Sequence, residues 1–238
     1  MGMKVLNIEV KNISKSYDDL KVIIDFNMCF SSNRIHCFFG PSGCGKTTLA
    51  NILTGVISAD SGHVIGKNNK KISYIFQEDR LLPWATVKEN ILFVLDSFHN
   101  KSEAQLLADK YLSMVDLLKF KNHYPHQLSG GMKQRVSIAR AFAYGGEILV
   151  MDEPFKGLHL GLKKNLMDYI IDNWNHESSF LFFITHDIDE AIYMADDIYI
   201  FNGPPLKLKR RVTIDTSRED RRNNKKLETY KKIILEDN

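Results

Sequence analysis

One eight-residue stretch, Gly40-Pro41-Ser42-Gly43-Cys44-Gly45-Lys46-Thr47, constrains the fold more than any other part of the chain. It matches the pattern G-x-x-x-x-G-K-[ST] and lies between a buried apolar segment at 34–39 and a helical pattern at 46–54. Glycines in such a loop let successive backbone N–H groups turn inward around phosphate oxygens, and the following helix adds the positive end of its dipole. The stretch therefore predicts a phosphate-binding loop at the end of a strand.

Each polar side chain of this loop has an expected partner. Lys46 is expected to reach the β- and γ-phosphates of a nucleotide, and the Thr47 hydroxyl to bind Mg²⁺. The residues expected to contact the nucleotide are Gly40, Pro41, Ser42, Gly43, Cys44, Gly45, Lys46, Thr47 and Thr48. The alternative is a glycine-rich turn with a solvated lysine, which the flanking strand and helix patterns disfavour.

Two carboxylates, Asp152 and Glu153, end a second apolar segment that spans 147–151. A parallel strand at this position would deliver both acids to the ligand-binding edge of the sheet. Asp152 could then hold Mg²⁺ through water, and Glu153 could orient or deprotonate an attacking water. Acids after a buried strand are often only caps or loop residues, so this motif carries weight only beside the phosphate loop.

The remaining pattern predicts an α/β fold with a mainly parallel sheet, because apolar strand-like segments alternate with helical ones. The strand-like segments lie at 71–76, 147–151, 179–184 and 197–201, and the helical ones at 46–54, 131–144, 160–174 and 187–195.

Two further regions depart from this alternation. Segments near 5–13 and 21–30 predict N-terminal strands, which we assign to an antiparallel β subdomain. Helical spacing within 101–120, with Ser102 and Gln105 in capping-box positions, predicts an inserted helical subdomain at about 88–143. We expect one domain over 1–205, followed by a basic C-terminal extension over 206–238.

Charge and cysteine usage limit the possible environments and partners. Of a formal net charge of +3, residues 207–238 alone contribute 11 Lys and Arg against 6 Asp and Glu, so the basic excess belongs to the extension and we expect no nucleic-acid partner. The three cysteines are odd in number and lack Cys-x-x-Cys spacing, which indicates reduced thiols in a cytosol. Apolar runs such as 180–184 are far shorter than the roughly 20 residues that cross a bilayer.

A third motif, Leu128-Ser129-Gly130-Gly131-Met132-Lys133-Gln134-Arg135, stands between the two phosphate motifs. With it, residues 5–205 resemble the nucleotide-binding subunits of ATP-binding-cassette (ABC) transporters. The resemblance implies a P-loop NTPase core with ATP and Mg²⁺ as ligands. It also implies a head-to-tail homodimer on ATP binding, in which Ser129, Gly130 and Gly131 of one chain close over the ATP on the other. Nucleotide kinases share the phosphate loop but lack this motif.

Further site residues follow from the same resemblance. Tyr17 is similar to the aromatic residue that stacks on adenine, Gln77 to the glutamine that senses Mg²⁺ and the γ-phosphate, and His186 to the histidine at the γ-phosphate. The implied catalytic set is Lys46, Gln77, Glu153 and His186, and the implied metal ligands are Thr47, Gln77 and Asp152. Taken singly, Tyr17, Gln77 and His186 have plainer interpretations as a surface ring, a strand-end polar residue and a residue near a helix cap.

The segment at 76–87 is similar to the branch that serves importers of nitrate, taurine and other sulfonates. It implies an ATPase on the cytoplasmic side of the membrane, coupled to an integral membrane permease and indirectly to an extracytoplasmic solute-binding protein. Leu82 and Trp84 are the expected permease contacts, with packing under the helical subdomain as the alternative. The competing function is a soluble, non-transport cassette ATPase that acts on nucleic acid or ribosomes.

The sequence also departs from the family pattern after Glu153-Pro154-Phe155. The family usually continues Ser-Ala-Leu-Asp, whereas this chain has Lys156-Gly157-Leu158-His159. The missing aspartate at His159 bears on the coupling of dimer closure to hydrolysis, and not on nucleotide binding.

Overall fold

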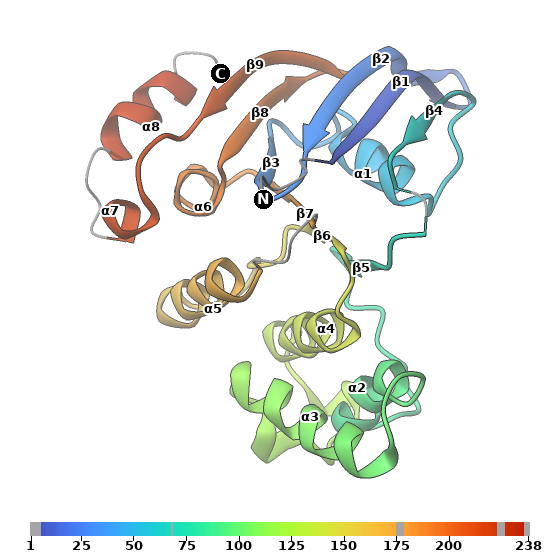
Figure 1. Cartoon of the computed structure of the whole chain (residues 1–238), viewed down its shortest axis with the longest axis vertical. Coiled ribbons are helices and arrows are strands. Elements are labelled where there is room, and N and C mark those ends of the chain that lie inside the picture. Colours follow the sequence, from blue (N-terminus) through green and yellow to red (C-terminus); the bar gives the residue numbers. More distant parts are fainter. Residues whose placement is uncertain (1–5, 68, 175–178, 223–226, 236–238) are drawn as a thin grey trace, which may run out of the picture. The chain divides into compact units, whose positions relative to one another are not determined.

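The computed structural model describes residues 6–67, 69–174, 179–222 and 227–235. The chain divides into two compact units (Figure 1). The first unit comprises residues 1–70 and 174–238, and the second comprises 71–173. Within the described ranges, no helix combines the length and the apolar character needed to cross a membrane.

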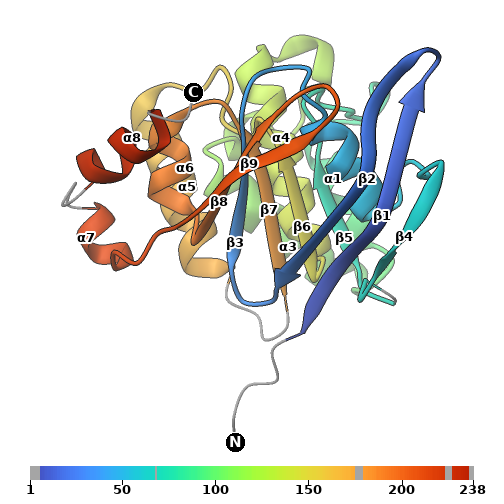
Figure 2. The same ribbon diagram turned by 90° about the horizontal axis from the view of Figure 1, so that it is seen from above.

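The first unit contains a small antiparallel sheet of β1 (Asn7–Tyr17), β2 (Leu20–Ser31) and β4 (Ser61–Ile65), in the order β2-β1-β4 (Figure 2). Ile8 and Val10 of β1 are buried at alternate positions, as strand periodicity predicts, and Ile13 is buried beyond a register shift in the pairing with β2. The predicted N-terminal antiparallel strands are confirmed. The sequence analysis missed β4, because four of its five residues are exposed and it carries no apolar alternation.

A second set of strands in this unit follows the order β7-β3-β8-β9. Its members are β3 (Ile35–Phe39), β7 (Phe180–Thr185), β8 (Asp197–Asn202) and β9 (Lys207–Thr213). β3 pairs in parallel with both β7 and β8, whereas β9 is antiparallel to β8. Every residue of β3 and β7 is buried, which explains their largely apolar sequences. The mainly parallel sheet of the prediction is confirmed.

The pairing of β9 extends this sheet beyond position 205, where the sequence analysis begins the C-terminal extension. The strand went unrecognised because its sequence, KLKRRVT, is mostly exposed and basic. An edge strand of this kind resists pairing with other chains, since lysine and arginine side chains repel a second edge.

Four helices belong to the first unit: α1 (Lys46–Thr54), α6 (Ile188–Met194), α7 (Arg218–Arg222) and α8 (Leu227–Leu235). Figure 1 shows α6, α7 and α8 grouped beside β8 and β9. Two apolar side chains of α8 pack inward, with Ile234 fully buried and Leu227 nearly so. Lys231 Nζ lies 2.7 Å from Asp189 Oδ1, which joins α8 to the first turn of α6.

The second unit combines a strand pair with a helical cluster. β5 (Ile72–Ile75) and β6 (Ile148–Asp152) are parallel. Helices α2 (Val87–Leu95), α3 (Lys101–Met114) and α4 (Gly130–Tyr144) pack together, which confirms the inserted helical part. Short 3₁₀ turns at Leu118–Phe120 and Pro125–Gln127 lead into α4, and α5 (Leu160–Asn173) follows β6.

The capping box expected at Ser102 and Gln105 is wrong. Asn100 caps α3 instead, and its side chain accepts a hydrogen bond of 3.0 Å from the backbone N–H of Glu103. Asn100 keeps an extended backbone directly before the helix, which lets its side chain reach the third amide, whereas Ser102 already lies within the first turn. A complete capping box does occur at α2, between Thr86 and Glu89.

A polar cluster is buried among the aromatic side chains of the first unit. His36 on β3 stacks on Phe182, donates from Nε2 to the Ser31 carbonyl oxygen at 2.9 Å, and lies 3.9 Å from Asp197. Burial lowers the pKa of His36 to about 4. Burial alone would raise the pKa of Asp197, yet hydrogen bonds from Arg34 and Thr213 lower it below its usual value.

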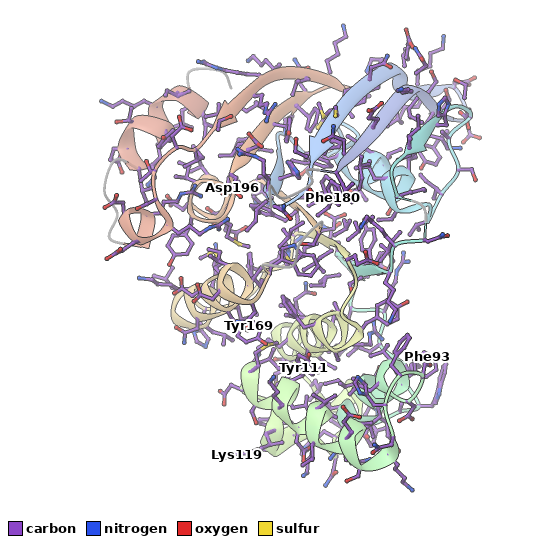
Figure 3. The ribbon with its side chains drawn as sticks, in the orientation of Figure 1. Phe93, Tyr111, Lys119, Tyr169, Phe180 and Asp196 are labelled. Carbon is purple, nitrogen blue, oxygen red and sulfur yellow. The ribbon has the colours of Figure 1, made fainter. Side chains whose placement is uncertain are left out.

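The neighbouring carboxylate, Asp196, anchors the C-terminal segment. Its side chain accepts the backbone N–H of Ile35 at 2.9 Å and the guanidinium of Arg218 at 3.0 Å (Figure 3). The start of β3 is therefore tied to the chain that follows β9.

We predict that His36 makes the folded protein less stable in acid. The folded-state pKa of His36 lies below the unfolded value of 6.5. The contribution of neutral His36 to the free energy of unfolding is therefore fully present above pH 6.5 and is lost as the pH falls toward 4. This pKa shift corresponds to about 3 kcal/mol in the free energy of unfolding. Chemical denaturation between pH 7 and pH 4 should show a steeper stability loss for the wild type than for His36→Gln. The control is His63→Gln, at an exposed histidine of β4. An equal loss of stability with falling pH in the wild type and in His36→Gln would refute the role of His36.

Candidate functional site

The phosphate loop connects β3 to α1 and needs glycine at both of its ends. Gly40 has a φ of +147°, and a Cβ there would lie 2.3 Å from the Phe201 carbonyl oxygen. Gly45 has a φ of +111°, with Val22 and Leu206 packed close beside it. Gly45 is also the N-cap of α1 and provides no side-chain cap, so the helix begins without one. The fold thus presents backbone amides and a helix N-terminus at the predicted position.

The side chain of Lys46 binds the backbone of its own loop. Its Nζ donates to the carbonyl oxygens of Gly40 at 2.8 Å and Pro41 at 2.7 Å, and it lies 3.6 Å from Cys44 Sγ. The residue is only 7% exposed, so these carbonyls replace water around the ammonium. These contacts hold the loop in a curled conformation.

The strand register brings His186 to the same edge of the sheet. Phe39, the last residue of β3, pairs with Thr185, the last residue of β7. Gly40 and His186 each come next in the chain, and both strands run in the same direction. The helix after His186 is capped by Asp187, which accepts the backbone N–H groups of Asp189 and Glu190. Two predicted phosphate-contacting elements thus emerge side by side.

Tyr17, Thr47 and Thr48, which are also predicted to contact the nucleotide, are at least partly exposed, whereas Cys44 is buried. Tyr17 ends β1 with a ring that is 46% exposed, and Lys15 Nζ lies 5.5 Å from the centre of that ring. Thr47 is exposed and Thr48 is half-buried in the first turn of α1. An exposed ring at a strand end is accessible to a flat ligand, which is what the prediction for Tyr17 requires.

Glu153, one of the two predicted carboxylates, contacts Gln77 within the second unit. Ile75 of β5 pairs with Met151 of β6, so the residues after each strand lie at one edge. Gln77 Nε2 donates to Glu153 Oε2 at 3.2 Å. Asp152 is 3% exposed at the end of β6, and Glu153 has a φ of +47°, which is unusual for a residue with a side chain.

The third motif, at 128–135, forms the start of α4. Ser129 is the N-cap, and its Oγ accepts the backbone N–H of Met132 at 3.3 Å. The helix begins at Gly130, one residue earlier than predicted. Ser129 and Gly130 are exposed, and a Cβ on Gly130 would have no neighbour within 4 Å. The surface is open at the point where the resemblance places a second phosphate contact.

Three hydrogen bonds, which the sequence analysis missed, tie α4 to the loops that carry Gln77 and Glu153. Gln134 Nε2 donates to the Pro154 carbonyl oxygen at 3.2 Å. Ser137 Oγ donates to the Asp79 carbonyl oxygen at 2.6 Å, and Arg140 donates to the same oxygen at 3.4 Å. No spacing rule reveals such contacts, because they join a helix to carbonyl groups far away in the sequence.

The departure from the family pattern has a structural counterpart. Lys156 Nζ lies 3.2 Å from Glu153 Oε2. His159 stands directly before α5 and accepts the backbone N–H of Leu162 at Nδ1, over 3.4 Å. An aspartate at this position would be a stronger cap for α5 than a histidine. His159 still accepts one backbone N–H and so retains part of that capping role.

The predicted metal ligands suit Mg²⁺ by their chemistry. Thr47, Gln77 and Asp152 offer a hydroxyl, an amide oxygen and a carboxylate, the oxygen donors that hard divalent cations prefer. Within the described ranges, no group of three or more His, Cys, Asp or Glu side chains is placed to hold a metal. Few protein ligands are expected for Mg²⁺, which keeps several waters and binds substrate phosphates.

Comparisons with known proteins agree with these features. Residues 23–156 match the family described as ABC transporter. The chain is 37% identical to the bicarbonate transport ATP-binding protein CmpD of Synechocystis, over 89% of this chain and 80% of that protein. It is 33% identical to the aliphatic sulfonates import ATP-binding protein SsuB of Bacillus cereus, over 97% of this chain and 94% of that protein.

A solved structure is similar as well. A dimeric ATP-binding cassette bound to ADP and Pi, in a post-hydrolysis state, matches with a TM-score of 0.79 and 26% identity. The match covers 88% of this chain and all of that one.

We predict that Lys46→Ala weakens ATP binding by at least about tenfold, because a methyl group cannot replace charge-assisted hydrogen bonds to phosphate oxygens. Equilibrium titration with a fluorescent ATP analogue measures the effect. Lys21→Ala, at an exposed lysine of β2, is the matched control. Thermal melts should confirm that both variants are folded, and a folded Lys46→Ala protein with wild-type affinity would contradict the phosphate site.

Proposed function

Because the chain belongs to the ABC transporter family, we propose that it is the ATP-hydrolysing subunit that drives a separate membrane permease. The proposal rests above all on the phosphate loop, which is curled around Lys46 and opens at the same sheet edge as His186. ATP is the expected substrate, and its β–γ phosphoanhydride is the bond that breaks to give ADP and phosphate.

Each residue of the predicted catalytic set has a proposed role in the reaction. Lys46 exchanges the carbonyls of Gly40 and Pro41 for phosphate oxygens, where its charge offsets the charge of the transferred group. His186 donates to the γ-phosphate. Glu153 accepts a proton from the attacking water, and Gln77 orients the Glu153 carboxylate through the hydrogen bond to Oε2.

Thr47, Gln77 and Asp152 would hold Mg²⁺ beside the phosphates. The ion would supply charge neutralisation at the β- and γ-phosphate oxygens. The protein's own share of the work is to place oxygen donors there and to keep Asp152 buried at the end of β6.

We further propose that two copies form a head-to-tail homodimer when ATP binds. Ser129, Gly130 and Gly131 of each copy would contact the nucleotide held by the other, at the exposed start of α4. Tyr17 would stack on the adenine. The dimeric form of the similar ADP-bound cassette supports this arrangement.

Trp84 is the proposed contact for the permease. Its side chain is 74% exposed, whereas Leu82 is half-buried and its backbone is held by Asn90, so Leu82 is a secondary contact. Phe93 on α2 is also well exposed (Figure 3). A large exposed apolar side chain is typical of an interaction site. The protein would then lie on the cytoplasmic side of the membrane as a peripheral subunit.

Import is the proposed direction, because the relatives that carry a solute in their names include bicarbonate transport and sulfonate import proteins. The solute would be of the nitrate, sulfonate or taurine type. An extracytoplasmic solute-binding protein would deliver it to the permease. No described feature favours the alternative of a cassette ATPase that acts on nucleic acid or ribosomes.

We predict that Glu153→Gln keeps ATP binding and stops hydrolysis, because an amide cannot accept the proton of the attacking water. MgATP should then convert the variant from monomers into a long-lived dimer, measured by size-exclusion chromatography with light scattering. The Lys46→Ala/Glu153→Gln double variant should remain monomeric. A single variant that binds ATP and stays monomeric would argue against the proposed dimer.

We predict that Trp84→Ala abolishes capture of the permease and leaves ATP binding unchanged. A tagged protein would be used to purify partners from detergent-solubilised membranes of its own cells. Leu160→Ala is the control, since Leu160 on α5 is even more exposed, at 82%. Equal recovery of integral membrane proteins by Trp84→Ala and the wild type would exclude Trp84 as the contact.

A further inference from the structure

The turn that follows Glu153 brings an ammonium group onto its carboxylate. The backbone N–H of Lys156 donates to the Glu153 carbonyl oxygen at 3.3 Å, which closes the turn. The Lys156 side chain then folds back, and its Nζ lies 3.2 Å from Glu153 Oε2. The ion pair is therefore built into the local backbone.

The same carboxylate oxygen also accepts a second donor. Gln77 Nε2 reaches Glu153 Oε2 at 3.2 Å, the same distance as Lys156 Nζ. Glu153 is held from both sides, by the loop after β5 and by its own turn. Its unusual backbone, with a φ of +47°, presents the side chain to both donors.

This arrangement opposes the role of Glu153 in the reaction. A general base must offer an oxygen to the attacking water and take up its proton. The ammonium of Lys156 and the amide of Gln77 occupy positions around Oε2 that this water would otherwise use.

We propose that Lys156 is a positioning residue that holds Glu153 in a resting arrangement with Gln77 and so restrains ATP hydrolysis. The inference rests on the proposed function, in which Glu153 is the general base. The serine usual in the family at this position could donate a hydrogen bond, but it carries no positive charge.

The exposure of the two side chains makes the contact reversible. The Lys156 side chain is 62% exposed and that of Glu153 is 15% exposed. The ammonium can therefore move into water without becoming a buried, unpaired charge. The next residue, Gly157, has a φ of +75° and its carbonyl lies beside Gly131 at the start of α4, so the turn adjoins the proposed dimer contact.

The test compares steady-state ATP hydrolysis by the full-length wild type, Lys156→Met and Lys156→Arg. Methionine keeps the apolar length of the side chain and removes its charge, whereas arginine keeps the charge. We expect Lys156→Met to raise kcat by about two- to fivefold with unchanged KM, the size expected for a largely exposed ion pair. Lys156→Arg should retain the wild-type kcat.

Lys164→Met, at an exposed lysine on α5, controls for the loss of one positive charge and should match the wild type. The ratio of Lys156→Met to wild-type turnover should fall toward one as salt rises, because ions screen an exposed pair. An equal or lower kcat in Lys156→Met, including the absence of turnover in both proteins, would overturn the inference. An increase that Lys164→Met or Lys156→Arg reproduces would overturn it as well.

Glu153→Gln separates this inference from the proposed function. If Glu153→Gln hydrolyses ATP as fast as the wild type, Glu153 is not the base and the proposed function fails in that respect. If Glu153→Gln is inactive while Lys156→Met equals the wild type, the proposed function stands and only the role of Lys156 is refuted.

Discussion

The parallel pairing of β3 with β7 and β8 is the constraint on which the phosphate half of the site depends. It buries all five residues of β3 and aligns Phe39 with Thr185, so that the phosphate loop and His186 leave the sheet at one edge. The same packing brings Phe201 so close to Gly40 that no Cβ fits between them. The neighbouring strand thus requires a glycine at the loop's first position.

Much of this arrangement follows from the sequence because it depends on local patterns. Buried parallel strands give continuous apolar segments, and the phosphate loop has a spacing that few other structures share. β4 and β9 lack such a signal, since both are exposed edge strands with mostly polar sequences. The cap of α3 was misplaced by two residues because several polar side chains compete near a helix start, and only the backbone conformation decides among them.

The carboxylate half of the site was less predictable. The sequence indicates Glu153 by its place after an apolar strand and Gln77 by resemblance, and the pairing of Ile75 with Met151 explains why they meet. Contacts such as Ser137 to the Asp79 carbonyl depend on how a helix lies against a loop, and no periodicity encodes that. The Lys156 contact had a weak local signal, because a lysine three residues after an acid can return to it within one turn.

The phosphate loop and the turn after Glu153 each satisfy a charged side chain with groups of the same chain, but with unequal consequences. Lys46 is held by neutral carbonyls, which are weaker partners than phosphate oxygens, so nucleotide binding replaces its contacts with stronger ones. Glu153 is held by a cation, so releasing it for catalysis gives up an ion pair. In the mechanism that we propose, this difference favours nucleotide binding over hydrolysis until a further interaction moves Lys156 away from Glu153. Such a restraint is the behaviour that coupling to a permease requires.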